Sequence, residues 1–158
     1  MKKRVVSVLI LIVGIFVGMG ITKRKEGERY GKAQMMSNKH LALFLMMNQW
    51  VRVKQEGKNL SKYMEKKCYK TIAIYGMSYA GERLLDELKD SNITVKYGID
   101  KKADEIYSEI DVVSPEKELE NVDAIIVTSV FFMDEIKKEL SAKVKCPIIS
   151  LEDILYEL

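Results

Sequence analysis

Cysteine and histidine are scarce in this sequence. Its 158 residues include two cysteines, Cys68 and Cys146, and a single histidine, His40. Neither a CxxC pair nor a zinc-ligand spacing occurs, so composition argues against a zinc site and a disulfide framework. We expect no metal cofactor, and we expect both cysteines to be small, buried and unpaired residues of a reducing compartment.

Charge of one sign is in the minority in each part of the chain. Residues 1–70 hold 16 Lys and Arg against 4 Asp and Glu, whereas residues 71–158 hold 10 against 19. A basic N-terminal part favours contact with anionic lipid. The acidic remainder argues against a nucleic-acid partner, because such partners are bound through basic surfaces.

Residues 5–21 carry no charge, and lysines and arginines flank this run on both sides. As a helix it would span about 25 Å at ~1.5 Å per residue, close to the thickness of a hydrocarbon core. A cleaved signal peptide is the alternative, but its apolar region is usually only ~7–15 residues long. We therefore expect residues 1–25 to be a single-pass membrane anchor. The larger number of cations after the run predicts that the following domain is cytoplasmic.

Residues 26–68 are predicted to form a linker and a helical stalk. The polar residues 22–34 indicate the linker, and an amphipathic helix from Met35 to about Lys54 follows, ended by Gly57. Its apolar residues are expected on one face: Met36, Leu41, Leu43, Phe44, Leu45, Met47, Trp50 and Val51. That face either packs on the following domain, lies in the membrane interface, or pairs with another chain, a second copy included. A short helix over about 60–67 completes the stalk.

Strands and helices alternate over residues 69–158. The expected strands are 71–75, 93–99, 110–113, 122–128 and 147–149, and the expected helices are 82–90, 131–143 and 151–158. This alternation predicts an α/β fold, a Rossmann-like three-layer parallel sheet in the strand order 3-2-1-4-5. The continuous apolar runs predict that both central strands are buried, through Ile72, Ile74, Ile125, Ile126 and Val127.

The turn after the first strand is the main functional signal. Gly76-x-Ser78-x-x-Gly81 approximates the G-x-G-x-x-G fingerprint of dinucleotide-binding folds, with Met77 and Tyr79 inside it. Gly76 suits a tight turn, and Gly81 suits a closely packed helix. Ser78 stands where backbone approaches a pyrophosphate, so its side chain either obstructs the ligand or donates a hydroxyl hydrogen bond to phosphate. The same glycines also suit a turn without any ligand.

Two further positions follow strands of the predicted sheet. Asp100 ends the second strand at about the spacing where an acid binds a ribose hydroxyl, although it also suits a turn. The lysines after it, Lys101 and Lys102, suit a 2′-phosphate and leave the cofactor type open. Thr128 and Ser129 end the fourth strand beside the topological switch point, and Ser129 also suits a helix cap.

The strand and turn sequences resemble a known group of domains. Ile72–Met77, Gly81–Leu85, Val95–Asp100 and Asp123–Thr128 are similar to Rossmann-like domains of bacterial surface-polysaccharide systems. These domains are of the nucleoside-diphosphate-sugar epimerase-like type and also resemble the N-terminal part of sugar acyltransferases. The resemblance covers about residues 60–158 and implies a site for NAD(P) or a nucleotide-sugar. The chain departs from the pattern at Ser78 and lacks the half that carries epimerase catalysis.

The expected function is a membrane-anchored module that binds a nucleotide or nucleotide-sugar in cell-envelope polysaccharide biosynthesis. Its binding residues would be Gly76, Met77, Ser78, Tyr79, Gly81, Asp100, Thr128 and Ser129. One alternative is a ligand-free docking module that holds a biosynthetic assembly at the membrane. Another is an NAD(P)-dependent enzyme completed by a partner chain, since no catalytic constellation occurs in this one.

Overall fold

The computed structural model describes the backbone from Lys2 to Leu158 and the side chains from residue 26 onward. The predicted anchor, residues 1–25, therefore lies outside the residues whose side chains are described. Among the described residues, no helix is sufficiently long and apolar to cross a membrane. The chain forms two compact units, residues 1–40 and residues 41–158.

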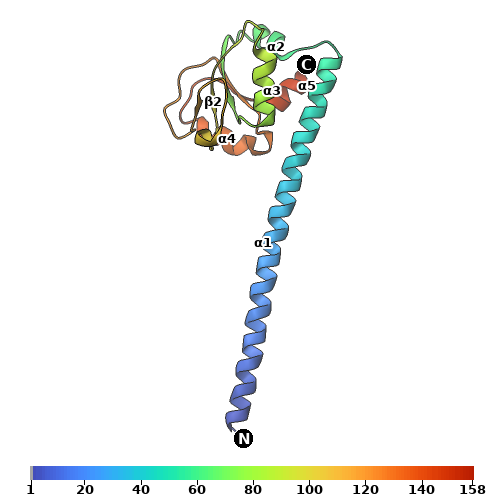
Figure 1. Ribbon diagram of the computed structural model, residues 1–158, viewed down its shortest axis with the longest axis vertical. Helices are drawn as coiled ribbons and strands as arrows, with labels where there is room; N and C mark the ends of the chain where they lie inside the picture. The colour runs from blue at the N-terminus through green and yellow to red at the C-terminus, as the bar shows by residue number, and fades with distance from the viewer. Residues whose placement is uncertain (1) are drawn as a thin grey trace. The chain divides into compact units, whose positions relative to one another are not determined.

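Helices and strands alternate through the second unit (Figure 1). The elements in chain order are α1 (Lys2–Gln55), α2 (Leu60–Lys66), β1 (Thr71–Tyr75), α3 (Tyr79–Leu88), β2 (Thr94–Ile99), η1 (Ala103–Glu105), β3 (Val112–Val113), β4 (Ala124–Val127), η2 (Val130–Phe132), α4 (Met133–Leu140), β5 (Ile148–Ser150) and α5 (Leu151–Glu157). The strands pair in parallel in the order β3-β2-β1-β4-β5. The predicted α/β class, the parallel sheet and its strand order are confirmed.

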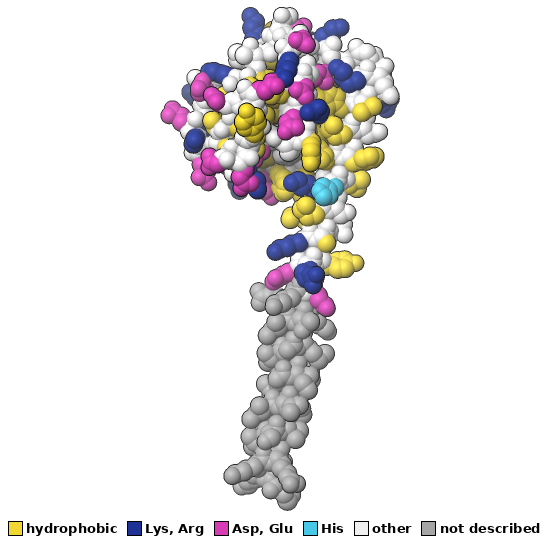
Figure 2. Space-filling model, in the orientation of Figure 1, with side chains coloured by type: hydrophobic (Ala, Val, Ile, Leu, Met, Phe, Trp, Pro, Cys, Tyr) yellow, Lys and Arg dark blue, Asp and Glu magenta, His cyan; other side chains and the backbone are white. Residues whose placement is uncertain are grey.

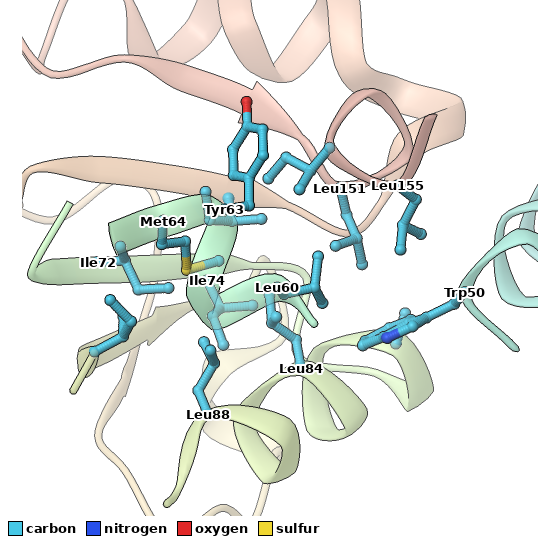
Figure 3. Packing of buried hydrophobic residues seen from close by; sticks show 14 of the residues in the cluster. Trp50, Leu60, Tyr63, Met64, Ile72, Ile74, Leu84, Leu88, Leu151 and Leu155 are labelled. Carbon is cyan, nitrogen blue, oxygen red and sulfur yellow. The ribbon is translucent and has the colours of Figure 1, made fainter. Parts of the chain in front are cut away.

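Two apolar layers cover the two faces of the sheet. On one face, side chains from α2, α3, α5 and the end of α1 pack on Ile72 and Ile74 (Figure 3). On the other face, Ile136 and Leu140 of α4 pack on side chains of β1, β2 and β4. The five residues predicted as the interior, Ile72, Ile74, Ile125, Ile126 and Val127, are all fully buried. Because β1 and β4 lie at the centre, each is covered on both faces.

Helix α1 differs from its prediction in extent. The polar segment 22–34, predicted as a linker, is helical and belongs to the single helix Lys2–Gln55. Its glycines are tolerated because a helix interior disfavours glycine by only about 1 kcal/mol relative to alanine. The helix ends as predicted at Gly57, which has a φ of +72°. The amide of Lys58 donates to the carbonyl of Val53, the bond that closes a Schellman motif.

The apolar residues of α1 lie on two faces rather than one. Met46, Trp50 and Val53 are buried in the apolar cluster on one face of the sheet, with Leu43 and Met47 partly buried beside them. The remaining predicted members of the stripe that fall in the second unit, Leu41, Phe44, Leu45 and Val51, are exposed. The helix does pack on the domain, through Trp50 of the predicted stripe together with Met46 and Val53, which were not in that stripe.

The cysteines are unpaired, as expected, but only one of them is partly covered. Cys146 is half-buried, whereas Cys68 is exposed and has a φ of +61°. The expectation that both would be buried is therefore wrong for Cys68. This residue follows α2 at the position that helix ends commonly give to glycine.

Candidate functional site at the carboxyl edge of the sheet

Three central strands end at the same level at the carboxyl edge of the sheet. Tyr75, the last residue of β1, pairs with Ile99 at the end of β2 and with Val127 at the end of β4. The residues that follow these strands therefore lie close together. In open parallel sheets ligands bind at this edge, where the strand order reverses.

Position 76 requires glycine for two reasons: there is no room for a side chain, and the backbone has a positive φ. Its φ is +96°, and a Cβ atom placed on it would collide with the hydroxyl of Ser129 and lie 2.8 Å from Oγ1 of Thr128. Its amide donates to the carbonyl of Ile99 at 2.8 Å, which closes the turn on β2. The predicted tight turn out of β1 is thus present.

Gly81 permits a close approach between α3 and the turn. A Cβ atom on Gly81 would collide with the carbonyl oxygen of Gly76. That oxygen in turn accepts a hydrogen bond from the hydroxyl of Thr128. The two glycines of the fingerprint therefore meet each other, and Thr128 of β4 holds the carbonyl that lies between them.

Met77 and Thr128 direct their side chains into the protein. The Met77 side chain is buried and packs closely on Gly98. A Cβ atom added to Gly98 would lie only 2.7 Å from Cγ of Met77. Thr128 is 4% exposed, and its hydroxyl donates to the carbonyls of Tyr75 and Gly76. Both residues shape the turn, so their side chains are not presented to a ligand at the surface.

Ser78 and Tyr79 lie on the outer side of the turn. Ser78 occupies the N-cap position of α3 with extended backbone, but its side chain makes no capping hydrogen bond. Tyr79, the first residue of the helix, is 76% exposed. The first amides of a helix have no intrahelical acceptor and carry the positive end of the helix dipole. This end of α3 is therefore suited to an anion.

Asp100 lies beside the turn, where its spacing predicted it. One carboxylate oxygen accepts the backbone N–H of Met77 at 3.0 Å, and the other accepts that of Lys102 at 2.9 Å. A carboxylate has about four acceptor positions, so two remain for hydroxyl donors. The neighbouring lysines are each near a carboxylate: Lys101 lies 3.8 Å from Glu139, and Lys102 lies 2.7 Å from Glu105.

Ser129 lies where the fourth strand leaves the sheet. It occupies the N-cap position of η2, and its side chain makes no capping hydrogen bond. Ser129 thus occupies a helix-cap position, as its alternative interpretation has it, but its hydroxyl does not serve as the cap. Its hydroxyl faces the Cα of Gly76 instead, which brings the loops after β1 and β4 into contact.

Tyr75 is a polar residue of this region that sequence reasoning treated only as part of an apolar strand. Its hydroxyl is buried and has no hydrogen-bond partner among the described residues. Burial first, and then the nearby carboxylates of Glu139 and Asp100, raise the pKa of Tyr75 to about 12. A tyrosine at the end of an otherwise aliphatic strand was the signal available in the sequence.

The arrangement can bind an anion and hydroxyl groups, but the described side chains contain no group of three His, Cys, Asp or Glu that could hold a metal ion. A parallel sheet in this order with a glycine turn and an acid after the second strand is consistent with a Rossmann-like α/β domain. The chain belongs to the family described as C2185-like, N-terminal, whose pattern matches residues 67–147, about half of the chain. No curated protein and no solved structure matches the sequence.

Proposed function

We propose that the domain binds a nucleotide or nucleotide-sugar at the carboxyl edge of its sheet, with the phosphates at the start of α3. The observation that supports this most is the N-terminus of α3, where the N-cap side chain makes no capping hydrogen bond. Ser78 is exposed and its side chain does not occupy the first amides of the helix. Amides at the start of a helix are suited to binding an anion. The family match covers this turn but its description names no ligand.

Asp100 supports a ribose hydroxyl as the second point of contact. Its two used acceptor positions bind backbone amides, which fixes the carboxylate beside the turn. The carboxylates near Lys101 and Lys102 reduce the positive charge available to a 2′-phosphate. An unphosphorylated ribose, as in NAD or a nucleotide-sugar, therefore fits this proposal better than NADP.

The proposed setting is the membrane, through residues 1–25, in cell-envelope polysaccharide biosynthesis. The uncharged run and its flanking cations support the anchor, and the resemblance of the strand sequences supports the biosynthetic role. Full-length protein should stay in the membrane fraction after high-salt and carbonate washing. Deletion of residues 1–25 should release it or leave only salt-sensitive binding. Release of the full-length chain by carbonate would contradict the anchor.

A melting-temperature screen of the full-length chain in a mild detergent tests nucleotide binding. The compounds are NAD, NADP, uridine diphosphate sugars and inorganic phosphate as a control. Ligand at 100 times its Kd stabilises the native state by about 2.7 kcal/mol, which gives a measurable rise in melting temperature. If no nucleotide raises it, the ligand-free docking module replaces this proposal.

Ser78→Asp locates the binding site within that experiment. A carboxylate beside phosphate is repelled, so the nucleotide-dependent rise should be lost. The apo protein should keep or gain stability, because aspartate is favoured at a helix N-cap. Asn59→Asp is the matched control, since Asn59 caps α2 by accepting from the amide of Lys62. It adds the same charge at another helix start and should leave nucleotide binding unchanged.

A further inference from the structure

The C-terminal end of α1 is apolar on both of its sides. Met46, Trp50 and Val53 face the apolar cluster on one face of the sheet and are at most 5% exposed. On the opposite side lie Leu41, Phe44, Leu45 and Val51, which are between 47% and 66% exposed, and the exposed Asn48 lies among them. We call these five residues, Leu41, Phe44, Leu45, Asn48 and Val51, the outer stripe.

The outer stripe cannot turn inward, because polar contacts fix the rotation of this part of α1. The indole N–H of Trp50 donates to Glu87 of α3 at 2.7 Å. The side chain of Gln49 donates to the carbonyl of Leu155 in α5 at 3.0 Å. A helix that is apolar all round is usually buried all round. Figure 2 shows hydrophobic side chains exposed on the described part of this helix.

The spacing of the outer stripe is that of a coiled-coil seam. Leu41 and Asn48 take the positions a of two successive heptads, and Phe44 and Val51 take the positions d. A single asparagine at position a is typical of parallel two-stranded coiled coils, where it pairs with its copy and fixes the register at some cost in stability. From this we infer that the outer stripe is the interface of a parallel homodimer, in which residues 41–52 of two copies of this chain pair in register.

The charges beside the outer stripe favour a second copy over a lipid surface. Arg52 lies 3.1 Å from Glu56, the residue directly after α1, and Lys54 lies 3.1 Å from Glu87 of α3. These cations are partnered within their own chain. They therefore repel a second copy less, and they attract anionic headgroups less, than unpaired cations would. Asn48 in the middle of the stripe is also unfavourable for insertion between lipid tails.

The interface is small, since each chain contributes only four half-exposed apolar side chains. Total areas below about 1,200 Å² are characteristic of weak and transient complexes. Association should therefore depend on concentration for protein in detergent. It should be stronger when the chains share one bilayer, because confinement raises their effective concentration.

Disulfide cross-linking of the full-length chain tests the register directly. The background carries Cys68→Asn and Cys146→Ala, which remove the native thiols. With a mild oxidant, Asn48→Cys and Leu41→Cys should each give a covalent dimer, because identical positions a face each other in a parallel pair. Lys62→Cys, on the exposed surface of α2, is the control and should stay monomeric.

A second change separates this interface from any contact made by residues 1–25. Phe44→Glu should lower cross-linking at Asn48→Cys at least tenfold, while Tyr107→Glu, at a fully exposed aromatic elsewhere, should not. Both variants should melt like the parent, since neither residue is buried. Absence of a dimer from Asn48→Cys, or one that Phe44→Glu leaves unchanged, overturns the inference. Quenching of a label on Asn48→Cys by brominated lipid also overturns it, because the stripe would then lie on the membrane.

Discussion

The carboxylate of Asp100 accepts a hydrogen bond from the backbone N–H of Met77, with 3.0 Å between Oδ2 and the amide nitrogen. This bond joins the end of β2 to the glycine turn after β1. The Met77 side chain is buried against Gly98, so the amide is held in place from both sides. Asp100 thus shapes the turn in the absence of ligand, whatever it contributes when a ligand is bound.

Removal of this carboxylate should destabilise the free protein. Asp100→Ala leaves the Met77 amide without its acceptor, which should lower the free energy of unfolding by about 1–3 kcal/mol. Asp100→Asn should cost less, because its amide oxygen still accepts one hydrogen bond. Urea denaturation measures both, with Asp104→Ala as a control at an exposed aspartate nearby. Equal stability of Asp100→Ala and the parent would show that the bond contributes nothing to the turn.

Truncation of a central-strand side chain should have the largest effect on stability. Ile126 of β4 is completely buried, so Ile126→Ala should lower the free energy of unfolding by about 2–5 kcal/mol. The variant should therefore melt well below the parent or fail to fold. Tyr107→Ala, at a fully exposed side chain, is the control and should change stability by less than about 0.5 kcal/mol. A normal melting temperature for Ile126→Ala would contradict the packing of β4.

The sheet was predictable because its signal is local. Runs such as Ala124–Val127, bounded by turn residues, mark buried strands, and the alternation with helices leaves few strand orders. The faces of α1 were not predictable, because a helix that is apolar all round fits several stripes equally well. Leu43 and Phe44 are adjacent in sequence, yet the structure places Phe44 outward. Only contacts with residues far along the chain, such as Glu87, decide which face is covered.

The glycine turn was predictable in position but not in its contacts. The spacing of Gly76 and Gly81 after a strand predicts a turn and a helix start, and both are present. The bond from Met77 to Asp100 depends on the pairing of β1 with β2, which residue spacing does not reveal. The inward hydroxyl of Thr128 depends likewise on the pairing of β1 with β4.

Cys68 offers a stabilising substitution at the end of α2. The amide of Cys68 donates to the backbone carbonyl of Glu65, and the amide of Tyr69 donates to that of Met64. These two bonds form a Schellman motif in which Cys68 has the left-handed backbone conformation. Left-handed backbone costs residues other than glycine about 1–2 kcal/mol. Cys68→Gly should therefore raise the free energy of unfolding by about 1 kcal/mol in urea denaturation under reducing conditions.

The matched control for this substitution is Cys68→Ala. Alanine also lacks the thiol but keeps the strained conformation, so no comparable gain is expected. If both variants stabilised the protein equally, the thiol and not the backbone would be the cause.

The buried hydroxyl of Tyr75 should make stability fall at high pH. Burial first, then the carboxylates of Glu139 and Asp100, raise the pKa of Tyr75 to about 12 from its ordinary value of 10.0. The folded state therefore keeps a proton that the unfolded state loses. The contribution of the protonated Tyr75 hydroxyl to stability is complete below pH 10 and declines between about pH 10 and 12. The slope expected from one such group is about 1.4 kcal/mol per pH unit.

Tyr75→Phe removes this pH dependence and also removes a buried hydroxyl that has no hydrogen-bond partner among the described residues. The variant should be as stable as the parent or more stable at neutral pH, because a buried polar group without a partner is unfavourable. Its advantage should grow above pH 10. Tyr97, whose pKa burial likewise raises to about 12, remains in both proteins, so it cancels in the comparison. Parallel urea titrations at pH 8 and pH 11 measure the difference. A constant difference at the two pH values would show that the Tyr75 hydroxyl ionises equally easily in the folded and unfolded states, and that its environment is polar.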